Sequence, residues 1–295
     1  MSVGVGIGKV ILVGEHFVVH GAPAIAQPLM HQKVHISLGD SGEPWECPQE
    51  GVSHLRAMCA HLGREPGECS IRVKSSLPIG LGLGSSAALA VALVRAFNPE
   101  LEDEEVRRRA HALERIAHGN PSGIDDAVAT HGRAIRFVRG EEIEVLPPRY
   151  VLPLWIATTP RVATTRDAVE MVAGHAQASP TRFVAQLAQS RALTDAAYHQ
   201  LGRGDHCALG RVMDENHGLL SELGVSIPAL DRLVTAARRA GAYGAKLTGG
   251  GMGGAIIALA PEGCDLGPAL KSAGALHVLA PWPESVDPQG LETST

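Results

Sequence analysis

The residues whose types and spacing most clearly suit a chemical function form the run Pro78–Ala88. It reads Pro-Ile-Gly-Leu-Gly-Leu-Gly-Ser-Ser-Ala-Ala. Alternating glycines lead to two hydroxyls, Ser85 and Ser86, and a stretch of helix-forming residues follows as far as Val94. Backbone N–H groups at a helix N-terminus bind anions, and glycine lets phosphate oxygens approach the main chain. The run therefore predicts a phosphate site, although a flexible turn with an ordinary serine cap has the same composition.

Two carboxylates further along the chain could complete a site for phosphoryl transfer. Glu114 borders the apolar stripe of its predicted helix, formed by Val106, Ala110, Leu113 and Ala117. A carboxylate in that position needs a cation or strong donors, unless it turns outward and pairs with Arg107, Arg115 or His118. Asp125 follows a turn of small and polar residues that by itself would need no function. Beside a phosphate loop, Asp125 is a candidate base for a substrate hydroxyl and Glu114 a candidate magnesium ligand.

Lys9 could supply the fixed positive charge that phosphoryl transfer also requires. It lies in a predicted strand next to Gly8, and alone it would be read as a solvated charge. The surrounding Gly-Val-Gly-Ile-Gly-Lys-Val lacks the spacing of a dinucleotide fingerprint and the Ser or Thr of a Walker A loop. His16 and His20 have the spacing of a metal pair but no further evident ligand, so His16 is better interpreted as a polar pocket residue.

The composition favours a soluble globular protein and excludes several other classes. The chain has 295 residues, 45% hydrophobic and 19% charged, with a net charge of −5, which argues against nucleic acid or an anionic membrane as partner. No apolar run approaches the roughly 20 residues of a membrane span. The five cysteines are scattered and form no CxxC pair, so we expect a reduced, cytoplasmic protein without a zinc site.

The elements that must position these residues follow from apolar periodicity. Strands are predicted at 10–13, 34–38, 71–74, 134–138, 142–146, 152–158 and 255–260. Helices are predicted after the glycine run, from Asn98 to Gly119, and at 164–173, 179–201, 205–223 and 228–240. Pro147-Pro148 is the candidate linker. We therefore expect an α+β protein with an N-terminal domain at 1–150, a C-terminal domain at 151–280 and a disordered tail at 281–295.

Four segments, in the same order along the chain, resemble the GHMP kinases in the version carried by mevalonate kinases. They are the stretch from Gly8 to Gly21 (GKVILVGEHFVVHG), the run Pro78–Ala88, the acidic segment 114–125, and Lys246–Gly254 (KLTGGGMGG). The segment 159–165 and the stretch from Met213 to Ser226 are similar to mevalonate kinases in particular. The resemblance spans residues 4 to 260.

The resemblance implies a two-domain fold, with a ribosomal-S5-like N-terminal half and a ferredoxin-like C-terminal half. It implies ATP-dependent phosphorylation of mevalonate in isoprenoid precursor biosynthesis, with Mg²⁺, and homodimers are common in the family. Asp125 would be the base and Lys9 would neutralise charge beside it, while Ser86 and Glu114 would hold Mg²⁺. Glu15, His16 and Thr248 would face mevalonate. The ATP phosphates would lie against Pro78, Gly80, Gly82, Leu83, Gly84, Ser85, Ser86, Ala87, Gly249, Gly250 and Gly251.

The sequence departs from the family pattern at Ile7, which replaces a usual proline, at Met252, which replaces a common glycine, and in the short stretch between Leu38 and Ile71. Alternatives are another GHMP kinase acting on phosphomevalonate, homoserine or a sugar, and a non-catalytic ligand sensor on the same scaffold. Sensors of that kind typically lose the lysine, the acidic pair or the serine, and all are present here.

Overall fold

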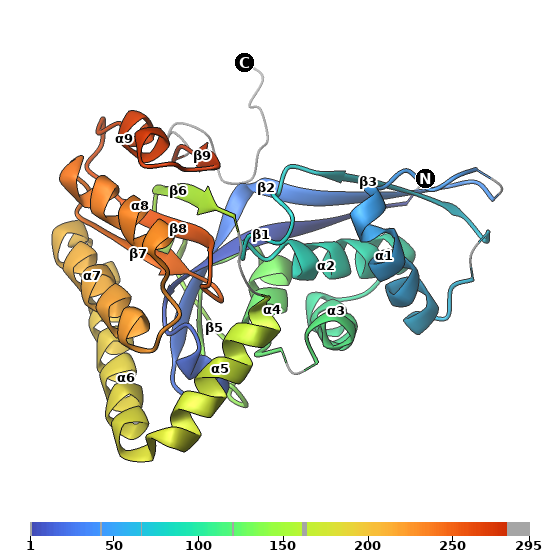
Figure 1. Ribbon diagram of the computed structural model, residues 1–295. Coiled ribbons are helices and arrows are strands. Elements are labelled where there is room, and N and C mark those ends of the chain that lie inside the picture. Colours follow the sequence, from blue (N-terminus) through green and yellow to red (C-terminus); the bar gives the residue numbers. More distant parts are fainter. Residues whose placement is uncertain (1, 42, 66, 120, 161–163, 282–295) are drawn as a thin grey trace.

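The computed structural model describes residues 2–41, 43–65, 67–119, 121–160 and 164–281, and it builds them around two antiparallel sheets (Figure 1). Beyond residue 281, the tail expected to be disordered lies outside the described residues. The α+β class predicted from the sequence is confirmed, with helices packed against both sheets.

The first sheet is built on two long strands, β1 (Val3–Val13) and β2 (Ala24–Gly39), which pair along most of their length. β3 (Ser70–Ser75) pairs with the later part of β2, β4 (Ile135–Phe137) with its beginning, and β5 (Glu144–Val145) with β4. β1 starts well before the predicted strand because its glycines pack against a helix. A Cβ on Gly4 or Gly6 would lie 1.9 Å from the carbonyl oxygens of Ala92 or Ala88.

Four helices belong to this half: α1 (Gln49–His61), α2 (Ser85–Phe97), α3 (Asp103–His118) and α4 (Ile124–His131). α2 is rich in buried alanine and lies directly on β1. The predicted start of α3 at Asn98 is wrong, and the helix begins at Asp103. Asn98 instead belongs to the end of α2, where its N–H donates to Val94 O. α3 buries Val106, Ala110 and Leu113, as predicted, and the side chain of Ala117 lies outside the described part.

The second sheet has the order β7-β8-β6-β9. Its strands are β6 (Leu154–Thr159), β7 (Gly244–Thr248), β8 (Gly254–Leu259) and β9 (His277–Leu279). Around it lie α5 (Thr165–Ala178), α6 (Pro180–Arg203), α7 (His206–Glu222), α8 (Pro228–Arg239) and α9 (Gly267–Ser272). All residues of β7 and β8 are buried, so this sheet forms the centre of its half.

The two halves meet along β1, β2 and the short helix η1 (Phe17–His20). The Gln27 side chain donates to Leu152 O and accepts from Leu152 N–H, at 2.9 and 3.0 Å. Thr194 on α6 donates to Pro23 O at 3.1 Å. The chain passes from one sheet to the other through η2 (Pro148–Tyr150), next to the predicted linker. The domain boundary at residue 150 stays a prediction.

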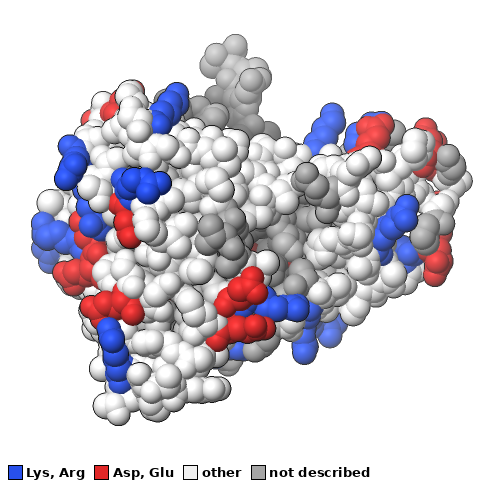
Figure 2. All heavy atoms as spheres, viewed as in Figure 1, with Lys and Arg blue, Asp and Glu red and all other residues white. Residues whose placement is uncertain are grey.

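The surface carries both signs of charge. On the face in Figure 2, Lys and Arg side chains are interspersed with Asp and Glu, without a broad area of one sign. In the part of the chain that the structure describes, none of the helices combines the length and apolar character needed to cross a bilayer.

Candidate functional site

A cavity of about 560 Å³ lies where the two halves meet. Residues from both halves line it, among them Lys9, Gly82, Glu114, Asp125, Gly249 and Gly250. Two glycine loops, at 80–84 and at 249–254, touch here, since a Cβ on Gly249 would lie 3.0 Å from Gly82 O. Residues predicted separately from distant stretches of the sequence thus share one site.

Lys9 and Asp125 form an ion pair in this cavity, with 3.0 Å between Nζ and Oδ1. The Lys9 side chain is 3% exposed, and its backbone N–H donates to Leu83 O at 2.9 Å, which ties β1 to the glycine loop. Asp125 lies in the first turn of α4 and keeps 36% of its side chain exposed. The lysine is therefore held in place, while its partner remains accessible to a substrate.

The glycine loop ends at the start of α2, as predicted. Gly84 precedes the helix with φ +77°, and the first intrahelical bond runs from Ala88 N–H to Gly84 O at 2.9 Å. The N–H groups of Ser85, Ser86 and Ala87 come before that bond, where helices bind anions. The side chains of Leu83 and Ala87 are buried, so any contact they make with phosphate uses the backbone.

At the outer part of the same loop, Gly80 has φ +74° and its N–H lies 3.4 Å from Ser85 Oγ. Pro78 and Gly80 are not among the described residues that line the cavity. The predicted contacts of Pro78, Gly80, Leu83, Ser85 and Ala87 with ATP phosphates stay predictions.

Glu114 is buried at 2% exposure and accepts a hydrogen bond from Ser86 Oγ. The structure therefore favours the site interpretation of Glu114 over an exposed helix glutamate, and Ser86 does not cap α2. Burial raises the pKa of Glu114 to about 8, against the lowering effect of the Ser86 hydrogen bond, and the charges of Asp125 and Asp126 raise it further. Such a carboxylate calls for additional positive charge.

The donor set of Ser86 and Glu114 fits Mg²⁺, which typically takes one or two protein oxygens and completes its shell with phosphates and water. In the described part of the chain, no group of three or more His, Cys, Asp or Glu could hold a metal ion.

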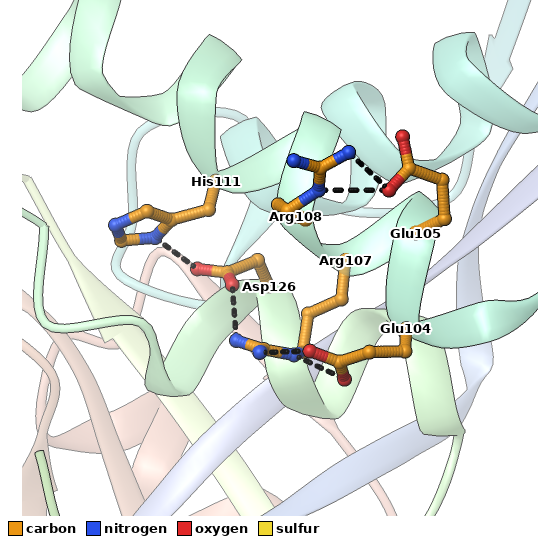
Figure 3. A network of polar contacts seen from close by, with 6 residues as sticks. All are labelled: Glu104, Glu105, Arg107, Arg108, His111 and Asp126. Carbon is orange, nitrogen blue, oxygen red and sulfur yellow. Dashed lines mark hydrogen bonds and ion pairs between the residues drawn. The ribbon is translucent and has the colours of Figure 1, made fainter. Parts of the chain in front are cut away.

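A polar network behind the cavity fixes the start of α4 (Figure 3). Buried Asp126 lies 3.2 Å from His111 Nδ1 and 4.0 Å from Arg107 Nη1, and Arg107 also pairs with Glu104. Arg107, His111 and Glu114 are spaced i, i+4, i+7 and share one face of α3. The face that presents Glu114 thus also positions Asp125. The sequence interpretation missed this network, although the spacing was available as a signal.

His16 and Glu15 follow β1 and line the cavity. His16 adopts a left-handed backbone, with φ 61°, and its Nε2 lies 3.1 Å from Gly250 O. Because a carbonyl only accepts, Nε2 is the protonated nitrogen, and burial lowers the pKa of His16 to about 4, so the ring is neutral. Glu15 is 1% exposed and forms an ion pair with Lys246 of β7. Sequence reasoning gave no role to Lys246.

The hydroxyl of Thr248 bonds to the backbone of Ile11 on β1. Oγ1 accepts from Ile11 N–H at 2.9 Å and donates to Ile11 O at 3.0 Å. Among the described residues, Gly249 and Gly250 line the cavity but Thr248 does not. Its predicted contact with substrate stays a prediction.

Two further parts of the lining differ from the sequence interpretation. Gly251 packs on Val225, since a Cβ there would lie 2.4 Å from Val225 O. Next to it, Met252 adopts φ 55°, which explains why this position commonly holds glycine. Arg166 and Glu170 of α5 also line the cavity, and no sequence signal was used to find them. Residues 161–163, in the segment similar to mevalonate kinases, lie outside the described residues.

Comparisons with known proteins identify both halves. Residues 52–133 match the family described as GHMP kinases N terminal domain, and residues 197–264 match GHMP kinases C terminal. The chain is 34% identical to the mevalonate kinase of Pyrococcus abyssi (strain GE5 / Orsay), covering 90% of this chain and 91% of that protein. It is 35% identical to the mevalonate kinase of Aeropyrum pernix, covering 87% of each. The crystal structure of L. major mevalonate kinase in complex with R-mevalonate superimposes with a TM-score of 0.81 at 28% identity, covering 97% of each chain.

Proposed function

The chain belongs to the GHMP kinase family, and from this premise we infer that it transfers the γ-phosphoryl group of ATP to mevalonate, forming 5-phosphomevalonate and ADP. Relatives named mevalonate kinase match almost the whole chain, and a solved mevalonate kinase with bound mevalonate has the same fold. The observation that carries the inference is the Lys9–Asp125 ion pair, which stands in the cavity beside the glycine loop.

Asp125 acts in this proposal as the group that orients and deprotonates the primary hydroxyl of mevalonate. The oxygen forms a bond to the γ-phosphorus as the bond to the bridging β–γ oxygen breaks, and the hydroxyl proton passes to the Asp125 carboxylate. Lys9 keeps the carboxylate in position and offsets negative charge near the transferred group. Phosphoryl transfer depends mainly on such positioning and charge stabilisation.

The ATP phosphates lie in this proposal against the N-terminus of α2, with Gly82, Gly84 and Ser85 supplying backbone N–H groups. Gly249 and Gly250 face them from the second half. Ser86 Oγ and the Glu114 carboxylate would hold Mg²⁺, which when bound neutralises the phosphate charge. Glu114 must lose its proton to act as a ligand, so metal binding and deprotonation of this carboxyl are linked.

Two other proposals rest on the sequence alone. We expect the protein to be cytoplasmic and able to form a homodimer, and cell fractionation and light scattering would test these expectations.

The activity is tested by a coupled assay of ADP release with purified protein, Mg-ATP and mevalonate. We expect mevalonate-dependent turnover, and its absence would refute the proposal. Phosphomevalonate, homoserine and galactose tested in parallel distinguish another GHMP kinase, which would prefer one of these acceptors. A non-catalytic sensor would bind mevalonate, detected by calorimetry, without releasing ADP.

A further inference from the structure

A buried ion pair joins the two halves at the cavity. Lys246 is 0% exposed in the middle of β7, and its Nζ donates to the Glu15 carboxylate and to Leu247 O. Glu15 belongs to the first half, directly after β1 and Gly14, and it is 1% exposed. Burial of two charges is costly unless their remaining hydrogen-bonding capacity is also satisfied. This pair therefore needs an explanation.

The explanation lies in the second carboxylate oxygen of Glu15. Oε1 accepts from Lys246, whereas Oε2 is buried and has no hydrogen-bond partner among the described residues. Buried polar atoms in native proteins nearly always have a partner. Because Glu15 also lines the cavity, the missing partner is best supplied by whatever fills that cavity.

The chemistry of Glu15 restricts what that partner is. An ionised carboxylate only accepts hydrogen bonds, so it suits a hydroxyl and repels a carboxylate or phosphate. Burial raises the pKa of Glu15, and the nearby charges of Lys246 and Lys9 act in the opposite direction. Lys246 thus stabilises the ionised form of Glu15, which only accepts hydrogen bonds, at a buried position where water does not solvate the charge.

Lys9 relates this pair to the reacting group. It contacts Asp125 directly, and its charge also acts on both Glu15 and Lys246. In mevalonate the tertiary 3-hydroxyl is separated from the reacting 5-hydroxyl by a single methylene between the two hydroxyl-bearing carbons. A substrate whose 5-hydroxyl lies at Asp125 therefore carries a second donor close to the reacting end.

We propose, on the basis of the mevalonate kinase function above, that Lys246 is a positioning residue that holds Glu15 so that Oε2 accepts a hydrogen bond from the 3-hydroxyl of mevalonate. The pair determines specificity. A site built to bind a hydroxyl discriminates strongly against an analogue that lacks it, because the buried acceptor is then left unpaired.

The test compares mevalonate with its 3-deoxy analogue, 5-hydroxy-3-methylpentanoate, in the ADP-release assay. For the wild-type protein we expect kcat/KM to be at least about 100-fold lower with the analogue. Equal efficiency with the two acceptors would overturn the proposal while leaving the kinase function intact. If wild-type protein released no ADP with mevalonate, the kinase function itself would fail.

The variant arm uses the neutral double substitution Glu15→Leu with Lys246→Met, which removes both buried charges and the acceptor oxygens of Glu15 together. We expect its preference for mevalonate over the analogue to fall to within about tenfold, with little change in KM for ATP. The same preference as wild type would show that the pair serves folding alone. The matched control, Glu262→Leu with Lys271→Met, changes exposed residues and keeps the wild-type preference. If the buried double variant fails to fold by circular dichroism, the analogue comparison on wild type can still overturn the proposal, since equal use of both acceptors excludes a bond to the 3-hydroxyl.

Discussion

At the scale of single residues, the difference in exposure between Lys9 and Asp125 determines how the pair can work. The ammonium group is 3% exposed and fixed in β1, whereas the carboxylate is 36% exposed at the start of a helix. The fixed ammonium group holds the carboxylate in position, and the exposure of the carboxylate leaves it accessible to a substrate hydroxyl. The pair is therefore suited to a reaction at the carboxylate, because an ion pair with a solvent-exposed partner contributes little to the stability of the fold.

We predict that Asp125→Asn lowers kcat by about 10²–10⁴-fold, because the amide keeps the shape of the side chain but cannot accept the proton. Mg-ATP affinity, measured by calorimetry, should stay close to wild type. Asp195→Asn is the control, since Asp195 is an exposed carboxylate paired with Arg136 outside the cavity. A kcat near wild type for Asp125→Asn would show that Asp125 is not the base.

Residue types alone made Lys9, Glu114 and Asp125 candidates for phosphoryl transfer. The resemblance to GHMP kinases placed Lys9 beside Asp125 and Ser86 with Glu114, and the structure brings each of these pairs into contact. Lys246 was missed because a lysine within an apolar strand is normally excluded, and only the distant Glu15 makes it tolerable. That compensation depends on tertiary contact, which local sequence does not contain.

At the scale of elements, the junction between the glycine loop and α2 is restricted by both backbone and space. Gly84 has φ +77°, and a Cβ there would lie 2.9 Å from Lys9 Cγ. The loop therefore sets the position of Lys9 as well as that of the helix start. A change in the loop should displace Lys9 and so alter its ion pair with Asp125.

Gly84→Ala is predicted to lower kcat at least tenfold, because the methyl group displaces Lys9 from Asp125. The left-handed backbone should also cost about 1–2 kcal/mol of unfolding free energy, measured by urea denaturation. Gly174→Ala is the matched control. Gly174 lies exposed within α5 with open space around it, so alanine there should leave kcat unchanged and add about 0.5–1 kcal/mol of stability. Wild-type kcat in Gly84→Ala would contradict the coupling.

His217 on α7 forms hydrogen bonds to β7 and α8, and the bond to β7 requires its neutral imidazole, so this connection depends on pH. Its Nδ1 accepts from Leu247 N–H at 3.3 Å, so Nε2 carries the proton and lies 3.2 Å from Asp231 Oδ1. Burial and the charge of Arg238 lower the pKa of His217 to about 4. This pKa is below the value of about 6.5 in the unfolded chain. The contribution of neutral His217 to the free energy of unfolding is therefore complete above pH 6.5 and is lost as pH falls toward 4.

We therefore predict that His217→Gln flattens the decline of unfolding free energy between pH 6.5 and 4 by up to about 1.4 kcal/mol per pH unit. Urea denaturation at a series of pH values measures this slope. His199→Gln, at an exposed position on α6, should keep the wild-type slope. An unchanged slope in His217→Gln would mean that His217 is not buried in its neutral form.

Long periodic elements such as α6, α7 and α8 were predicted within a few residues, because their apolar spacing is regular over several turns. α4 was interpreted as a turn, since His118–Asp126 is dense in turn residues and the helix is only 8 residues long. β7 was missed as well, because Gly244 and Lys246 disfavour a strand locally. Burial of the whole strand between α7 and β8 overrides that preference.

At the scale of the whole molecule, β1 is the part on which both halves depend. It carries Lys9 in its middle and leads into Glu15 and His16 at its end, and the second half contacts it through Thr248. The cavity is therefore not a gap between two independent domains. Its walls are set by hydrogen bonds that cross the interface, and the relative position of the two glycine loops follows from them.

Thr248→Val tests whether this residue acts on the interface or on the substrate. Valine has the shape of threonine but cannot bond to Ile11, so a buried N–H and a buried carbonyl lose their partner. We predict a loss of about 1–3 kcal/mol of unfolding free energy in urea denaturation, with similar increases in KM for ATP and for mevalonate because both loops shift. Thr235→Val, at an exposed position on α8, should change neither. If Thr248→Val instead raised KM for mevalonate alone and left stability unchanged, the hydroxyl would leave Ile11 to bind substrate, and the role predicted from the sequence would be correct.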